Sequence, residues 1–162
     1  DAPYEGLVAL DGNLTGELLR QIAHSPLFSK SDLRVAPASP GKADRLLALV
    51  GHPSATLYVN LEEASLLCHT DFPSSETAAK GLIARGCKRV LVTDGGSSAS
   101  EATGEDVITL TPPKVLVTRV TGAGDTFMAA HIASEREGMN RHDALERALF
   151  AAATYVSGEI PK

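Results

Sequence analysis

Short apolar runs alternate with amphipathic segments along the first part of this chain. Strand-like runs cover residues 7–10, 33–36, 56–59 and 89–93, and helical patterns lie between them, over 15–23, 42–50, 62–68 and from Ser74 or Ser75 to Gly86. Successive parallel strands need a crossover of about a dozen residues, which is usually a helix. The alternation therefore predicts a mainly parallel sheet covered by helices, with ligands binding beyond the carboxyl ends of the strands.

The pattern changes after residue 93. Segments 97–103 and 106–110 are short and separated by Gly104-Glu105, which predicts an antiparallel hairpin at an edge of the sheet. Two more helices are expected, one after Gly124 and one over 141–157. Because no linker, repeat or low-complexity tract interrupts residues 1–162, we expect one α/β domain, a three-layer Rossmann-like sandwich.

The run from Val120 to Phe127 reads Val-Thr-Gly-Ala-Gly-Asp-Thr-Phe. Gly122, Ala123 and Gly124 leave room for a phosphate to approach the backbone N–H groups at a helix start, where the helix dipole also favours anions. Asp125 follows directly. An anion hole beside a carboxylate can deprotonate a hydroxyl and stabilise the phosphoryl group that it attacks. The alternative is a tight turn followed by an Asp that only favours the dipole.

Two common phosphate-binding loops do not fit this run. A dinucleotide fingerprint, as in a Rossmann oxidoreductase, needs a glycine where Phe127 stands. A Walker loop needs a lysine where Asp125 stands. The run is therefore typical of neither class.

Polar residues also follow the other strand-like runs. Asn60 and Glu63 have the i, i+3 spacing that lets both face one side, and Glu63 is a candidate to hold magnesium through water. The same pair fits a helix capping box, and both interpretations stay open. Lys42 lies at a strand-to-helix junction, where it either reaches a phosphate or is solvated.

Composition excludes several classes of partner. The net charge of −5 argues against a nucleic-acid-binding surface, and no apolar run approaches the roughly 20 residues that cross a bilayer. Cys68 and Cys87 have no metal-type partner nearby in the sequence, and we expect them to be buried thiols in a reducing compartment. We therefore expect a cytoplasmic protein with neither a nucleic-acid nor a membrane partner.

Four motifs together resemble those of the ribokinase-like (PfkB) carbohydrate kinase family. Residues 121–125 match the core of its second signature, Asp-Thr-x-Gly-Ala-Gly-Asp, and residues 60–63 resemble its Asn-x-x-Glu motif. Residues 92–96 resemble the strand end and glycine turn of its nucleotide site, and residues 10–13 its Asp-x-Asn strand end. The resemblance covers only the C-terminal half of the family fold, so the half that carries most sugar contacts and the lid is expected to be absent.

The resemblance implies a role for each motif. Asp125 would be the catalytic base, with Gly122, Ala123 and Gly124 as the anion hole. The residues implied to contact ATP are Thr93, Gly95, Gly96, Asn60, Lys42 and Thr121. Those implied for Mg²⁺ or its bound water are Glu63, Asn60 and Asp11, with Asn13 beside them or acting as a helix N-cap.

The sequence departs from the family pattern at one informative position. Arg119 stands where relatives often carry an acidic residue that helps to build a monovalent-cation site, so activation by potassium is left open. The run Ala-Ser-Pro-Gly-Lys-Ala at 38–43 is similar to a segment of pseudouridine kinases. Dimers in the family use the absent half, so a homodimer of the full-length protein also stays open.

The favoured interpretation is the nucleotide-binding and catalytic portion of an ATP-dependent sugar or nucleoside kinase. On this interpretation the 162 residues alone are expected to bind nucleotide weakly and to have negligible activity. The alternative is a non-catalytic nucleotide-binding or regulatory module that keeps the fold. Asp125 argues against the alternative, because a pure binder needs no carboxylate beside a polyphosphate.

Overall fold

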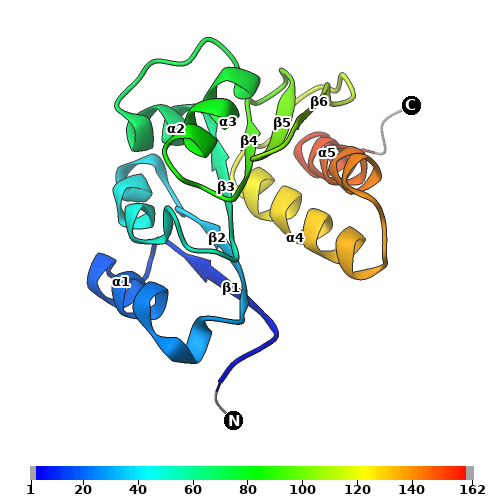
Figure 1. Ribbon diagram of the computed structural model, residues 1–162. Coiled ribbons are helices and arrows are strands. Elements are labelled where there is room, and N and C mark those ends of the chain that lie inside the picture. The colour runs from blue at the N-terminus through cyan, green and yellow to red at the C-terminus, as the bar shows by residue number, and fades with distance from the viewer. Residues whose placement is uncertain (1–2, 160–162) are drawn as a thin grey trace.

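A computed structural model describes residues 3–159 and shows a six-stranded sheet with helices on both faces (Figure 1). The strands lie in the sheet in the order of the chain: β1 (Leu7–Asp11), β2 (Asp32–Ala36), β3 (Ala55–Asn60), β4 (Arg89–Thr93), β5 (Ala99–Thr103) and β6 (Val107–Leu110). Strands β1 to β4 are parallel, whereas β5 and β6 pair antiparallel at the edge. The predicted mainly parallel sheet and its edge hairpin are confirmed.

The helices form two outer layers. One face of the sheet is covered by α1 (Gly16–His24), the 3₁₀ helix η2 (Pro40–Leu49), α2 (Leu61–Cys68) and α3 (Ser75–Ala84), whereas α4 (Ala123–Arg136) and α5 (Arg141–Ser157) lie side by side on the other face (Figure 1). A short 3₁₀ helix, η1 (Pro26–Phe28), precedes β2. The three-layer prediction is thus confirmed.

Alternation along the central strands builds the two cores. Leu57 and Val59 of β3 pack toward the first helical layer, and Tyr58 between them packs toward α4 and α5. In β4, Val90 and Val92 point to the first layer and Leu91 to the second. Successive side chains of a strand point to opposite faces, so a strand buried on both faces has a continuous apolar run.

Local structure differs from the predictions at three points. The segment predicted as a helix over 42–50 is a 3₁₀ helix, with i to i+3 hydrogen bonds from Lys42 N to Ser39 O (3.0 Å) and from Val50 N to Leu47 O (3.3 Å). Helix α4 begins at Ala123 rather than after Gly124. Asn13 does not cap α1, because the Thr15 side chain accepts the N–H of Leu18 there.

Within residues 3–159, every helix is too short or too polar to cross a bilayer. Cys87 is buried and Cys68 is partly buried, and both are free thiols. Burial raises the pKa of the Cys87 thiol to about 12.

A group of ion-paired and hydrogen-bonded side chains connects the second half of α4 to the sheet, and we call this group the charge network. Its members are Asp32, Arg34, Tyr58, Arg89, Glu101, His131, Glu135 and Arg141. The side chains of Glu101 and His131 are fully buried. Two of its members, Asp32 and Arg89, are the first residues of β2 and β4. The charge network therefore lies toward the amino ends of the parallel strands.

Glu135 and His131 connect α4 to the central strands. Glu135 Oε2 accepts a hydrogen bond from Arg34 Nη1 (2.6 Å), and Glu135 Oε1 accepts one from Arg89 Nη2 (2.5 Å). Arg34 Nη1 also donates to the Tyr58 hydroxyl oxygen (2.9 Å), and that hydroxyl forms a hydrogen bond with His131 Nδ1 at 2.8 Å.

Glu101 is the central acceptor of the charge network. Its Oε1 accepts hydrogen bonds from Arg89 Nε (2.8 Å) and Arg141 Nε (2.8 Å), and its Oε2 lies 3.5 Å from His131 Nε2. Burial alone would raise the pKa of Glu101, but His131 and the two guanidinium groups outweigh burial and lower the pKa to about 2. The carboxylate is therefore held ionised inside the protein.

Candidate functional site

A cleft of ≈ 450 Å³ opens at the carboxyl ends of β2, β3 and β4, and we call it the central cleft. It brings together eight of the residues that the sequence analysis singles out: Asn60, Glu63, Thr93, Gly95, Gly122, Ala123, Gly124 and Asp125. The loop of residues 36–40 lines its other side. Residues up to 91 positions apart, from Ala36 to Phe127, meet here because the carboxyl ends of parallel strands share one edge of the sheet.

The amino end of α4 presents backbone donors to the central cleft. Gly122 is the N-cap and has a left-handed φ of 88°, a conformation that favours glycine. The Ala123 N–H is bonded to the Val120 carbonyl oxygen (3.1 Å), and the first intrahelical N–H is that of Thr126, to Gly122 O (2.9 Å). The N–H groups of Gly124 and Asp125 precede that bond and lack a helical acceptor, so they are suited to an anion.

Asp125 is an exposed residue of the first turn of α4 and lines the central cleft. Within residues 3–159 its carboxylate forms no hydrogen bond and no ion pair. An unpaired carboxylate beside free N–H donors can accept a proton from a hydroxyl that approaches the bound anion.

Asn60 and Glu63 form a capping box at the start of α2. Glu63 N donates to Asn60 Oδ1 (2.8 Å), and Asn60 N donates to Glu63 Oε2 (2.8 Å). Burial raises the pKa of Glu63, the hydrogen bond from Asn60 N opposes that rise, and the charge of Glu62 adds to it. Among the described residues nothing donates to Glu63 Oε1, so this oxygen is left for a ligand in the cleft. A carboxylate oxygen of this kind fits Mg²⁺ or its bound water.

A second cleft of ≈ 570 Å³ continues from the first, and we call it the apolar cleft. Its lining is largely hydrophobic and comes from segment 112–120 and from α5: Pro112, Pro113, Val115, Val117, Val120, Leu149, Ala152, Ala153 and Val156. It shares Thr93, Gly95, Ala123 and Gly124 with the central cleft and also reaches Gly96. An apolar cleft joined to an anion site suits a ligand with a flat base at one end and phosphates at the other.

Four residues singled out from the sequence, Asp11, Asn13, Lys42 and Thr121, line neither cleft. Asp11 Oδ1 accepts the N–H of Asn13 (2.8 Å), and Lys42 Nζ donates to Asn13 Oδ1, so Asp11 and Lys42 meet through Asn13. The carbonyl oxygen of Thr121 accepts a hydrogen bond from the Tyr155 hydroxyl (2.8 Å).

The sequence analysis missed the apolar cleft. The sequence pattern predicts only a helix over 141–157, which contains Leu149, Ala152 and Val156, and it assigns no element to segment 112–117. The sequence signal for this cleft is the run Lys-Val-Leu-Val that follows Pro112-Pro113. Its three apolar residues have no flanking pattern that assigns them to a helix or a strand. Leu116 and Val117 are 82% and 52% exposed, as expected of a loop beside an open cleft.

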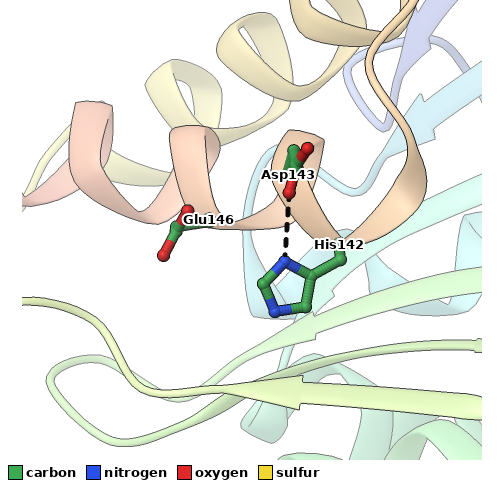
Figure 2. Close-up of side chains that lie close together, drawn as sticks. All are labelled: His142, Asp143 and Glu146. Carbon is green, nitrogen blue, oxygen red and sulfur yellow. Dashed lines mark hydrogen bonds and ion pairs between the residues drawn. The ribbon is translucent and has the colours of Figure 1, made fainter.

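A separate group of titratable side chains lies on the first turns of α5. Figure 2 shows His142, Asp143 and Glu146, with one interaction drawn, between His142 Nδ1 and Asp143 Oδ1 (3.2 Å). All three residues are exposed, and Asp143 also accepts a hydrogen bond from Asn140 Nδ2 (2.8 Å). The group has the geometry of a capped helix start and lies outside the central and apolar clefts, whereas Asp143 and Glu146 line a third cleft of ≈ 560 Å³.

Comparisons with known proteins concern the family and the fold. The model of the pfkB family carbohydrate kinases matches residues 5–159. A carbohydrate kinase from Agrobacterium tumefaciens is 24% identical with a TM-score of 0.75, over 96% of this chain and 55% of its own. A putative sugar kinase from Clostridium perfringens is 22% identical with a TM-score of 0.81, over 93% and 48%. An adenosine kinase from Sinorhizobium meliloti is 19% identical with a TM-score of 0.78, over 95% and 49%.

These structural likenesses establish the fold, and the chain spans about half the length of the structures that it matches. In the search of curated proteins, no sequence matches the chain.

Proposed function

The chain belongs to the pfkB family of carbohydrate kinases, and from this premise we propose that it is the nucleotide-binding and catalytic portion of an ATP-dependent sugar or nucleoside kinase. One observation carries the proposal. Asp125 lines the central cleft without a partner among the described residues, directly beside the backbone donors at the amino end of α4. Other exposed carboxylates in the described part of the chain also lack partners, and Asp125 differs from them in lying beside free backbone N–H donors in a cleft, where it can accept a proton from a bound hydroxyl.

In the proposed reaction, a hydroxyl oxygen of the sugar or nucleoside attacks the γ-phosphorus of ATP. The bond from that phosphorus to the β,γ-bridging oxygen breaks, ADP leaves, and the hydroxyl proton passes to the Asp125 carboxylate. Negative charge on the transferred group is stabilised by the backbone N–H groups at Gly122, Gly124 and Asp125 and by the helix dipole.

The two clefts suit the two ends of the nucleotide. The apolar cleft would hold the base, and Thr93, Gly95 and Gly96 lie where the ribose and phosphates would pass toward α4. Glu63, with Asn60 fixing its position, would hold Mg²⁺ through Oε1 or a bound water. When bound, Mg²⁺ neutralises charge on the phosphates.

A non-catalytic nucleotide-binding module is the second candidate. It requires only the two joined clefts, which suit a nucleotide whether or not a phosphoryl group is transferred. In the kinase proposal the remaining sugar contacts come from outside these residues. We therefore expect the isolated 162-residue chain to bind nucleotide weakly and to transfer no phosphoryl group.

The proposal is tested with the protein as it is encoded. It is incubated with MgATP and a panel of sugars and nucleosides, and phosphorylated products are identified by ³¹P NMR, with Asp125→Asn beside the wild type to detect contaminating kinases. We expect one substrate class to be phosphorylated by the wild type alone. Nucleotide binding without transfer to any member of the panel would favour the binding module.

A further inference from the structure

The segment before α4 is attached to the last turn of α5. Thr118 N and Arg119 N both donate to the Val156 carbonyl oxygen, at 2.8 and 3.2 Å, and Arg119 Nε donates to the Tyr155 carbonyl oxygen at 2.7 Å. Carbonyl oxygens in the last turn of a helix lack helical donors and carry the negative end of the dipole. Residues 118 and 119 therefore act as a C-cap for α5, supplied from a distant part of the chain.

Tyr155 returns a hydrogen bond from α5 to this segment. Its hydroxyl donates to the Thr121 carbonyl oxygen at 2.8 Å, and the Arg119 guanidinium lies over its ring, 4.2 Å from the centroid. The ring is thus held by a cation–π contact on its face and by a hydrogen bond at its tip. Arg119 and Tyr155 together form what we call the Tyr155 clamp.

The Tyr155 clamp acts on the peptide that joins Thr121 to Gly122. The C=O and N–H of a trans peptide point in opposite directions. Because Tyr155 holds the Thr121 carbonyl oxygen, the Gly122 N–H points away from Tyr155, and Gly122 itself lines the central cleft.

The tyrosine hydroxyl also limits which residue fits at position 122. A Cβ built on Gly122 would lie 2.6 Å from the Tyr155 hydroxyl oxygen, and the φ of 88° is unfavourable for a side chain in any case. The Tyr155 hydroxyl therefore occupies the space that a side chain at position 122, the N-cap of α4, would need.

We propose that Tyr155 is a positioning residue for the phosphoryl transfer, holding the Gly122 N–H toward the anion in the central cleft. The inference rests on the proposed function and extends it to a residue that lines neither cleft. Arg119 supports it by holding the ring of Tyr155.

The test is Tyr155→Phe in the protein as it is encoded, which removes the hydroxyl and keeps the ring on which Arg119 lies. Tyr4→Phe is the matched control, because Tyr4 is 44% exposed and contacts the ring of Phe28, outside both clefts. We expect Tyr155→Phe to lower kcat roughly 10-fold, less than the loss of a direct oxyanion donor, while KM for ATP changes less than about twofold. Thermal unfolding midpoints of the two variants should agree.

Two results would overturn the proposal: a kcat equal to that of Tyr4→Phe, or a loss of kcat matched by a lower unfolding midpoint. The ¹⁵N–¹H signal of Gly122, recorded with and without MgADP, gives a readout that needs no turnover. If the wild type phosphorylates nothing, the proposed function fails, and the clamp is judged by this signal alone. A Gly122 signal that is the same in wild type and Tyr155→Phe, and responds equally to MgADP, contradicts the clamp.

Discussion

The two ends of α4 handle charge in opposite ways. At its amino end, Gly122, Gly124 and Asp125 present polar groups to an open cleft without protein partners in the described part of the chain. Toward its carboxyl end, His131 and Glu135 are enclosed and bonded to side chains from the central strands. The carboxyl end of α4 is thus bonded to the sheet, whereas its amino end has polar groups that are free to bind a ligand.

The difference separates structural from functional carboxylates. Burial alone would raise the pKa values of Glu101 and Glu135, but His131 and guanidinium groups outweigh burial and lower both, so these carboxylates are already occupied by their partners. Asp125 has no such partner among residues 3–159. A rigid attachment at one end of the helix lets the other end hold unpaired groups in a defined place, as a preorganised site requires.

The largest effect should come from Asp125→Asn. Loss of a general base typically lowers turnover 10²–10⁴-fold, so we expect about a 10³-fold loss of sugar-dependent ATP turnover with an unchanged unfolding midpoint. Asp143→Asn is the matched control, since Asp143 occupies the same third position of its helix and lines neither the central nor the apolar cleft. Equal turnover in the two variants would reduce Asp125 to a residue that only favours the helix dipole.

At the other end of α4, Glu101→Gln should act on stability instead. It removes the shared acceptor of Arg89 and Arg141 from a buried site, which we expect to lower the free energy of unfolding by about 3 kcal/mol. Denaturant unfolding measures the loss, and Glu105→Gln in the same hairpin, an exposed residue, should stay within about 0.5 kcal/mol of wild type. If Glu101→Gln and Glu105→Gln have the same free energy of unfolding, the charge network does not stabilise the fold.

Acid should weaken the same end of the helix. The pKa of Glu101 is about 2 in the folded protein against 4.5 ordinarily, so the unfolded chain binds a proton first as pH falls through this window. The contribution of Glu101 to the free energy of unfolding is therefore fully present above about pH 5 and is lost toward pH 2. By pH 3 this contribution has fallen by roughly 2 kcal/mol. Unfolding curves from pH 7 to pH 3 test this, and the slope should be shallower in Glu101→Gln.

The smallest effect concerns Glu63, where capping and metal binding coincide. A glutamine keeps the capping box, so Glu63→Gln should change the free energy of unfolding by less than about 1 kcal/mol. The Mg²⁺ concentration for half-maximal turnover should rise about 10-fold, as for loss of a group that supports metal binding. Glu62→Gln, the same change at the exposed neighbour, should leave both quantities unchanged. An unaltered Mg²⁺ requirement in Glu63→Gln would leave Glu63 as a capping residue only.

The central cleft was largely predictable because its residues follow strand-like runs. Asn60 and Thr93 end parallel strands, and the glycine run at 122–124 precedes a helix, so the fold class alone places them at one edge. The i, i+3 spacing of Asn60 and Glu63 likewise predicted the capping box that the structure contains.

The charge network and the apolar cleft depend on tertiary contacts that spacing does not encode. Arg34 interrupts an apolar strand and Glu101 lies in a hairpin, but their link through Arg89, Glu135 and His131 joins residues up to 101 positions apart. The course of segment 112–120 is set by its bonds to the end of α5, and no local pattern reports such bonds.

The order of the strands also has a consequence for how the chain is synthesised. Each strand pairs with the strand before it in the sequence, so a chain leaving the ribosome can add each new strand to the edge already formed. Helices α4 and α5 follow the six strands in the chain and pack on strands that are already in place. The glycine turn before α4 and Tyr155 follow β6 in the chain, so they are synthesised after all six strands, and a chain interrupted between β6 and α4 has a sheet without an anion site.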